Sequence, residues 1–159
     1  DLYDGKLAVH EVGLLLSLKT LWLDPNGIFA MQGERYPITE IGLVRLVEKL
    51  IERGLQDRDS PDVQVRLTPD HKHGNVNTEL IQVRRAKPSG RENDFSLAEI
   101  VIELQRQLIL GYRSFGCPEE EGDDPPLLES YANFDVQTNV GLGDEDFDVN
   151  NPDYQYPSL

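Results

Sequence analysis

The residues best suited to chemistry stand near the C-terminal end of the chain, in the run DEDFDVN that begins at Asp144. Because Asp144, Asp146 and Asp148 alternate with other residues, their carboxylate oxygens could converge on a hard cation such as Ca²⁺. An EF-hand loop would need glycine at its sixth position and glutamate at its twelfth, where this chain has Val149 and Gln155. The three aspartates are therefore weak metal candidates, and we expect a solvated acidic segment with no cofactor.

The histidines and the single cysteine are the other side chains that could bind a metal or act as nucleophiles. His71 and His73 are spaced to share a zinc ion on a strand, but the sequence DHKHGN around them predicts a turn, and the remaining histidine is His10. Cys117 precedes the acidic sequence PEEE, whereas a catalytic thiol needs an electropositive setting. These residues indicate an exposed loop and an unreactive thiol rather than a site.

Common catalytic motifs are missing from the sequence. The chain has no GxSxG, GxxxxGK[ST], GxGxxG or HExxH pattern. Their absence removes the most frequent esterase, nucleotide-binding and zinc-protease classes, so a non-enzymatic role is favoured. An uncommon metal-dependent enzyme that uses the aspartate run stays an alternative.

Basic residues gather where the second strand of a predicted hairpin ends, at Arg84, Arg85, Lys87 and Arg91, and Arg66 is expected across the hairpin. Such a cluster could bind phosphate groups. Nucleic-acid-binding domains are usually basic overall and interleave aromatic residues with their cations, so nucleic acid is not favoured here. The cluster is either a solvated strand end or a docking site for an acidic arm, from this chain or a neighbour. We prefer the docking site over nucleic acid.

The net charge of −14 is divided unevenly along the chain. Residues 1–117 hold 17 acidic and 15 basic side chains, whereas residues 118–159 hold 12 acidic side chains and no Lys or Arg. This division predicts a near-neutral compact domain at 1–117 and an acidic extended arm at 118–159. The longest apolar run, 14–23, is too short to span a bilayer. We therefore expect no membrane contact and a location in the cytoplasm or within an assembled particle.

The clearest predicted element is a helix over residues 39–54. Its large apolar residues fall on one side of a 3.6-residue period, and its charged residues fall on the other. Thr39 is spaced as the N-cap, and Gly54 as the residue that ends the helix. The predicted apolar face consists of Leu43, Val44, Leu46, Val47, Leu50 and Ile51.

Alternating apolar and polar residues predict strands at 62–68 and 76–86, which form a hairpin with a long loop. Residues 28–38 are predicted to add two short strands to the same sheet. Residues 9–23 are apolar and fit either a helix or a strand, and their leucine content favours a helix.

A second helix is predicted over residues 97–110, after a linker at 87–94. Leu97, Ile100 and Leu104 share one side of a helical period, and Ser96 and Glu99 are spaced as a capping box. The predicted fold is therefore an α+β domain, in which a small, mostly antiparallel sheet packs against two or three helices.

The acidic arm contains isolated aromatic residues that could anchor it on a partner: Tyr131, Phe134, Phe147 and Tyr154. Residues 128–137 have the best strand character in the arm and could add to a sheet edge. The sequence thus predicts a non-enzymatic structural or adaptor subunit of a larger assembly, for example a phage or virus particle, whose partners are proteins or further copies of itself. The main alternative is an acidic mimic of nucleic acid that blocks a basic protein surface.

Overall fold

The structure, a computed structural model, describes residues 2–9, 20–32, 36–87, 90, 94–118, 120 and 122–154. The chain forms two compact units. The first, here called the sheet unit, consists of residues 47–136. The second, here called the terminal unit, combines residues 1–46 with residues 137–159. In the part of the chain that is described, no helix is both long enough and apolar enough to cross a bilayer.

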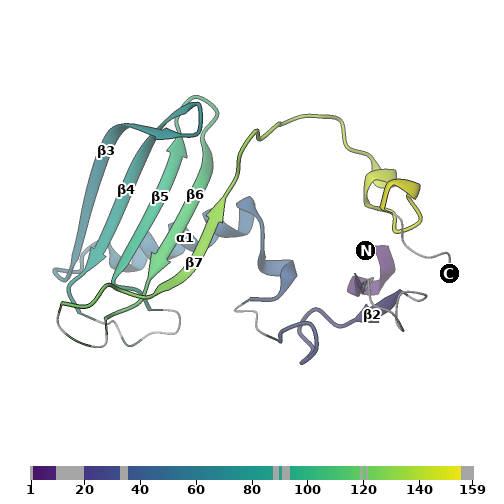
Figure 1. The fold of residues 1–159 in the computed structure, drawn as a ribbon, viewed down its shortest axis with the longest axis horizontal. Coiled ribbons are helices and arrows are strands. Elements are labelled where there is room, and N and C mark those ends of the chain that lie inside the picture. Colours follow the sequence, from purple (N-terminus) through teal and green to yellow (C-terminus); the bar gives the residue numbers. More distant parts are fainter. Residues whose placement is uncertain are drawn as a thin grey trace. The chain divides into compact units, whose positions relative to one another are not determined.

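A five-stranded antiparallel sheet, in the order β3-β4-β5-β6-β7, forms most of the sheet unit (Figure 1). Each strand pairs with the next one along the chain, so β3 and β7 are the two edges of the sheet. The strands are β3 Val63–His73, β4 Val76–Arg85, β5 Leu97–Glu103, β6 Leu108–Phe115 and β7 Leu127–Ala132.

The hairpin predicted from residues 62–68 and 76–86 is confirmed as β3 and β4. The two strands pair from Val63 opposite Arg85 to His73 opposite Val76. The turn is formed by Gly74 and Asn75, and Gly74 has a φ of 57°, which glycine adopts at little cost. The connection is shorter than predicted because β3 continues through the histidines expected in a loop.

The helix predicted over residues 97–110 is wrong, because this segment forms β5 and β6. The sequence LAEIVIE places apolar residues three and four apart, but the apolar residues Ala98, Ile100 and Ile102 also recur at every second position. Both periods fit the same residues, and hydrogen bonding to a strand on either side decides in favour of the sheet. The connecting turn, residues 104–107, ends at Gln107, which has a φ of 57° and directly precedes β6.

The residues predicted to cap that helix serve the sheet instead. The Ser96 hydroxyl donates a hydrogen bond to the Gly116 carbonyl over 2.5 Å. The Glu99 carboxylate accepts one from Arg113 over 2.6 Å and another from Gln82 over 2.9 Å. The spacing of a capping box was therefore fortuitous, since serine and glutamate are equally able to join neighbouring strands.

The α-helix predicted over residues 39–54 exists as α1, Leu43–Asp57, and lies further along the chain. Thr39 is in the 3₁₀ turn η2, Ile38–Glu40, so its prediction as the N-cap is wrong. The prediction that Gly54 ends the helix is also wrong, because α1 continues to Asp57. On the predicted apolar face, the four residues Leu43, Leu46, Val47 and Leu50 are partly buried, whereas Val44 and Ile51 are exposed.

α1 runs across one face of the sheet (Figure 1). Its last residue, Asp57, contacts Arg85 of β4, which identifies the covered face as the one to which Arg85 points. Strand residues two apart share a face, so Val63, Val65 and Leu67 of β3 also lie on the α1 side. Buried apolar residues of the sheet unit include Phe95, Ala98, Leu110 and Tyr112.

The terminal unit contains a two-stranded antiparallel sheet of β1, Leu7–Val9, and β2, Leu21–Leu23. Residues 10–19, which make up most of the segment predicted as helix or strand, lie outside the described residues. Besides η2, the described part of this unit contains three further 3₁₀ turns. They are η1 Leu2–Gly5, η3 Asp144–Phe147 and η4 Pro152–Tyr154.

The two strands predicted in residues 28–38 are wrong for the residues described there. Residues 28–32 form turns, with the Gly27 N–H bonded to the Asp24 carbonyl over 2.9 Å and the Met31 N–H bonded to the Gly27 carbonyl over 3.0 Å. Ile28 and Phe29 are exposed. The backbone bonds locally in this stretch, so these residues do not extend the sheet as expected.

The α+β class predicted from the sequence is therefore wrong. The described residues form a mostly β structure with a five-stranded and a two-stranded antiparallel sheet. Its helical elements are α1 and short 3₁₀ turns. The error has one main cause, since the predicted second helix is a pair of sheet strands.

Candidate functional site

Two adjacent arginines of the predicted basic cluster point to opposite faces of the sheet. Arg84 is exposed, whereas Arg85 is buried, because successive side chains of a strand alternate between faces. Lys87 is exposed beyond the end of β4, and Arg91 lies outside the described residues. The structure thus leaves Arg84 and Lys87 on the surface and places Arg85 in an interior network of ion pairs.

This network joins α1 to the sheet. Arg85 donates a hydrogen bond to Asp57, and the two side chains are only 4% and 7% exposed. Arg53, one turn earlier in α1, donates to Asp57 over 3.1 Å and to Asp94 over 3.1 Å. The ring of Phe95 packs against both guanidinium groups, each 5.4 Å from the ring centroid. Two cations and two carboxylates therefore balance one another, with Arg85 and Asp57 buried and Arg53 and Asp94 partly buried.

The electrostatics of Asp57 indicate a structural role. Burial by itself raises the pKa of its carboxyl, but the hydrogen bonds and positive charges of Arg85 and Arg53 outweigh burial and lower the pKa from its usual 3.8. A carboxylate that stays ionised into acid is unsuited to exchanging protons near neutral pH. Asp57 therefore holds α1 in place rather than acting as an acid or base.

The outer edge of β3 is open. Among the described strands, β4 is the one that pairs with β3. The Ala86 N–H bonds to the Asp62 carbonyl over 2.8 Å, and directly bonded pairs recur at every second residue of an antiparallel ladder. Residues 64, 66 and 68 therefore bond toward β4, and the N–H and C=O groups of Val65 and Leu67 point outward.

The side chains along this edge are exposed as well. Val65 is 68% exposed and Leu67 is 54% exposed, both on the α1 side of the sheet. Arg66, between them, is exposed on the opposite face. An incoming strand would thus meet unpaired backbone groups, two apolar side chains on one face and a cation on the other.

A β-bulge limits the usable length of the edge. The register of β3 against β4 shifts between Thr68 and His71, so that Pro69 and Asp70 form an irregular step. Asp70 has a φ of 55°, and Pro69 has no N–H to donate. Regular pairing on the outer edge is therefore confined to residues 63–68.

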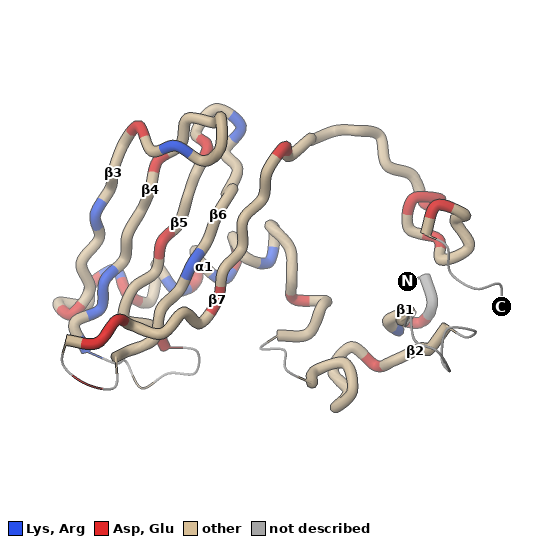
Figure 2. The backbone as a smooth tube through the Cα atoms, viewed as in Figure 1, with Lys and Arg blue, Asp and Glu red and all other residues tan. Residues whose placement is uncertain are grey.

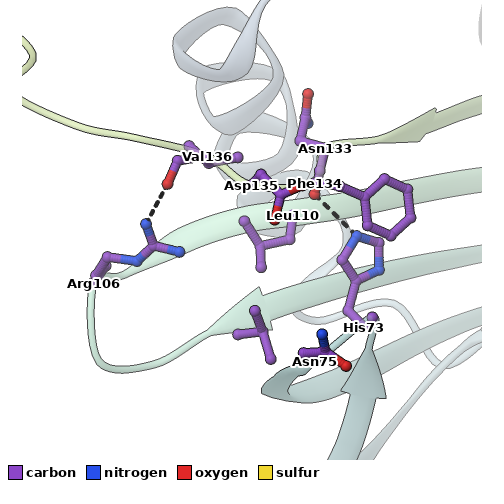
Figure 3. Close-up of a pocket in the computed structure, with 10 residues that line it drawn as sticks. His73, Asn75, Arg106, Leu110, Asn133, Phe134, Asp135 and Val136 are labelled. Carbon is purple, nitrogen blue, oxygen red and sulfur yellow. Dashed lines mark hydrogen bonds between the residues drawn. The ribbon is translucent and has the colours of Figure 1, made fainter.

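A pocket of about 460 Å³ lies at the other end of the β3–β4 hairpin, under the chain that follows β7 (Figure 3). His73 stacks on Phe134, with ring centroids 4.4 Å apart and planes inclined by 6°. Its Nε2 donates to the Asn133 carbonyl over 3.0 Å. These contacts hold residues 133–134 against the hairpin.

Arg106 closes another side of this pocket. Its guanidinium donates to the Val136 carbonyl over 2.6 Å and to Glu103 over 2.7 Å. The carboxylate of Glu103 already neutralises Arg106, so the pocket offers no strong attraction for an anion. Its aromatic and cationic groups mainly fasten residues 133–136 to the sheet.

Two of the four predicted aromatic anchors belong to the sheet unit itself. Tyr131 lies in β7 opposite Tyr112, with ring centroids 6.3 Å apart, and Phe134 stacks on His73. Residues 127–132, which belong to the arm expected at 118–159, form β7, the second edge of the sheet. The structure thus places the strand character noted in residues 128–137 within this chain's own sheet.

The other two anchors, Phe147 and Tyr154, lie in the terminal unit. Phe147 is 60% exposed. The Tyr154 hydroxyl donates to the Asp146 carbonyl and so joins η4 to η3. Figure 2 shows that the described residues after 136 carry acidic positions and no Lys or Arg. Phe147 thus presents an exposed aromatic ring on an acidic segment.

The weak metal candidates are not brought together as a cation site. The Asp146 carboxylate accepts from the Gly143 N–H over 2.7 Å, and the Asp148 carboxylate accepts from the Asn150 N–H over 2.9 Å. Asp144 is the first residue of η3 and is exposed. Within the described ranges, no group of three His, Cys, Asp or Glu side chains is arranged to hold a metal ion.

Sequence reasoning missed the β3 edge and the contact between His73 and Phe134. The edge could have been suspected from Pro69, because proline within a strand pattern indicates an edge strand. No local signal announced the contact between His73 and Phe134, since it joins residues far apart in the chain. Cys117, considered as a nucleophile, is exposed.

Comparison with known proteins gives a family without an assigned activity. No curated protein and no solved structure matches the chain. The model of one family, described as a protein of unknown function (DUF1571), matches residues 1–156. The chain therefore belongs to the DUF1571 family.

Proposed function

We propose that this protein is a non-enzymatic adaptor subunit of a larger protein assembly, which binds an extended segment of a partner along the outer edge of β3. One observation carries the proposal: outward backbone groups and exposed apolar side chains coincide at Val65 and Leu67. Strand addition to an open edge uses the backbone groups for affinity and the alternating side chains for selectivity.

The arrangement around the edge supports binding of a single short strand. The side chains of Val65 and Leu67 continue the apolar α1 side of the sheet, so a docked strand could extend that face. The bulge at Pro69 and Asp70 ends regular pairing, and Arg66 discourages contact with strands that place a cation opposite it.

The acidic C-terminal segment supplies a second contact region in this proposal. Phe147 is its exposed apolar anchor, and its carboxylates orient the encounter with a basic partner and speed association. The setting we propose is the cytoplasm or an assembled particle. The single, exposed thiol of Cys117 is compatible with a reducing compartment.

Amide hydrogen exchange measured by NMR tests the proposal with an uncharged probe, a synthetic peptide that alternates valine and threonine. The amides of Val65 and Leu67 point outward, so we expect them to exchange fast in the free protein and slowly with the peptide. The amides of Arg66 and Thr68 already bond to β4 and serve as internal controls. Unchanged exchange at Val65 and Leu67 in excess peptide would refute strand addition.

A pair of variants separates backbone pairing from apolar contact. Val65→Pro removes an outward N–H without removing a bond to β4, so it should abolish peptide binding while the sheet stays folded. Val65→Thr keeps the N–H and should retain most of the binding. Equal binding by both variants would show that the peptide contacts another surface.

A further inference from the structure

The register of the β3 edge defines the sequence that would fit it. In an antiparallel docked strand, the residues opposite Leu67 and Val65 fall on the α1 side and should be apolar. The residue between them falls opposite Arg66, on the other face, and should be acidic. The edge therefore selects the pattern apolar–acidic–apolar.

The chain itself contains this pattern twice with identical residues, as Phe-Asp-Val at 134–136 and at 147–149. The first copy is engaged within the sheet unit. Phe134 stacks on His73, the Val136 carbonyl accepts from Arg106, and Asp135 has a φ of 52°, which is not extended.

The second copy is better suited to docking. Phe147 is exposed at the end of the short turn η3. Asp148 already has extended backbone angles, with φ −81° and ψ 126°. To become a strand, the segment would have to open the four-residue 3₁₀ turn η3 and release the hydrogen bonds that the Asp148 carboxylate accepts from Asn150. Short 3₁₀ turns are weakly stabilised, and the Arg66 guanidinium would offer the Asp148 carboxylate a new partner.

We propose that residues 147–149 of one copy add to the β3 edge of a second copy, with Phe147 opposite Leu67, Asp148 opposite Arg66 and Val149 opposite Val65. This inference rests on the proposed function and names a partner for it. Charge favours this pairing over the symmetrical ones. Two β3 edges would bring two Arg66 side chains together, and two C-terminal segments carry no cation between them.

A head-to-tail contact of this kind joins different surfaces of the two copies, so it produces a ring or an open chain of subunits. Sedimentation velocity of the full chain should therefore show larger species as the concentration rises. Arg66→Glu or Asp148→Arg alone should weaken self-association roughly tenfold or more, because an attractive pair becomes repulsive. Lys72→Glu and Asp153→Arg are matched controls and should leave it unchanged.

Mixing the two variants identifies the source of the segment. In an equimolar mixture of Arg66→Glu and Asp148→Arg, the two variants can alternate along the assembly. Each junction between unlike copies then pairs opposite charges at positions 66 and 148, so assembly should recover. The double variant should recover as well. Protection of the Val65 and Leu67 amides at concentrations where the full chain still sediments as a monomer would show docking within one chain and overturn the exchange between copies.

A peptide covering residues 143–152 distinguishes failure of this inference from failure of the proposed function. It should protect the Val65 and Leu67 amides, whereas the same peptide with Asp148→Arg should not. Protection by the uncharged valine–threonine peptide but not by the 143–152 peptide would overturn the inference and leave strand addition standing. Protection by neither peptide would overturn both.

Discussion

Arg85, the last residue of β4, donates a hydrogen bond to Asp57, the last residue of α1, and both side chains are almost completely buried. Removing one member of a buried ion pair leaves an uncompensated charge. Asp57→Ala should therefore lower the free energy of unfolding in urea by about 3–5 kcal/mol. Asp59→Ala, an exposed change two residues later, should alter it by less than about 0.5 kcal/mol. Similar losses in both variants would contradict the assigned role of Asp57.

The same carboxylate predicts a dependence of stability on pH. The pKa of Asp57 is lower in the folded protein than its usual 3.8, so its stabilisation is complete above that value and is lost as the pH falls through the folded pKa. Between neutral pH and pH values below 3.8, the wild type should lose more unfolding free energy than Asp57→Asn, which cannot titrate. Parallel stability curves for the two proteins would rule out this contribution.

Ser114, the next-to-last residue of β6, has a fully buried hydroxyl oxygen that makes no hydrogen bond to any described residue. An unsatisfied buried polar atom costs free energy that a methyl group does not. Ser114→Ala should therefore raise the unfolding free energy by about 1 kcal/mol. Ser130→Ala, on the exposed surface of β7, should have little effect. A marked loss of stability in Ser114→Ala would mean that the hydroxyl is bonded after all.

Two glycines should respond in opposite ways to the same substitution. A Cβ on Gly111 would lie 3.2 Å from Cγ2 of Val101 and 3.6 Å from Cε1 of His73. Gly111→Ala should therefore cost about 1–3 kcal/mol and shift the NMR signals of the His73 and Phe134 rings. Apart from its chain neighbours and the backbone of α1, a Cβ on Gly54 would meet no described atom within 4 Å, so Gly54→Ala should stabilise the protein by about 0.5–1 kcal/mol. Calorimetric melting of both variants checks the sign of each effect.

Local sequence patterns predicted the elements whose residues fit one period. The hairpin of β3 and β4 was predicted correctly because Val63, Val65 and Leu67 alternate with polar residues. α1 was predicted because its apolar residues recur at helical spacing, although its ends were misplaced. Asp57 extends the helix through ion pairs with Arg85, which is distant in the sequence and leaves no local signal.

The failures arose where distant residues decide the structure. Residues 97–103 satisfy a helical and an alternating period at once, and the neighbouring strands β4 and β6 select the strand. The predicted cluster of Arg84 and Arg85 ignored the alternation of faces within β4. The open edge of β3 was missed because it depends on the order of strands in the sheet, for which Pro69 was the one local indication.

The irregular step at Pro69 and Asp70 has a consequence for the long-term solubility of the protein. Fibril growth by cross-β stacking needs a flat, uninterrupted edge on which identical chains can add without limit. β3 offers such an edge only before the step, and Arg66 repels its own counterpart in an in-register stack. The same few residues that can hold one extended segment should therefore resist uncontrolled polymerisation into amyloid.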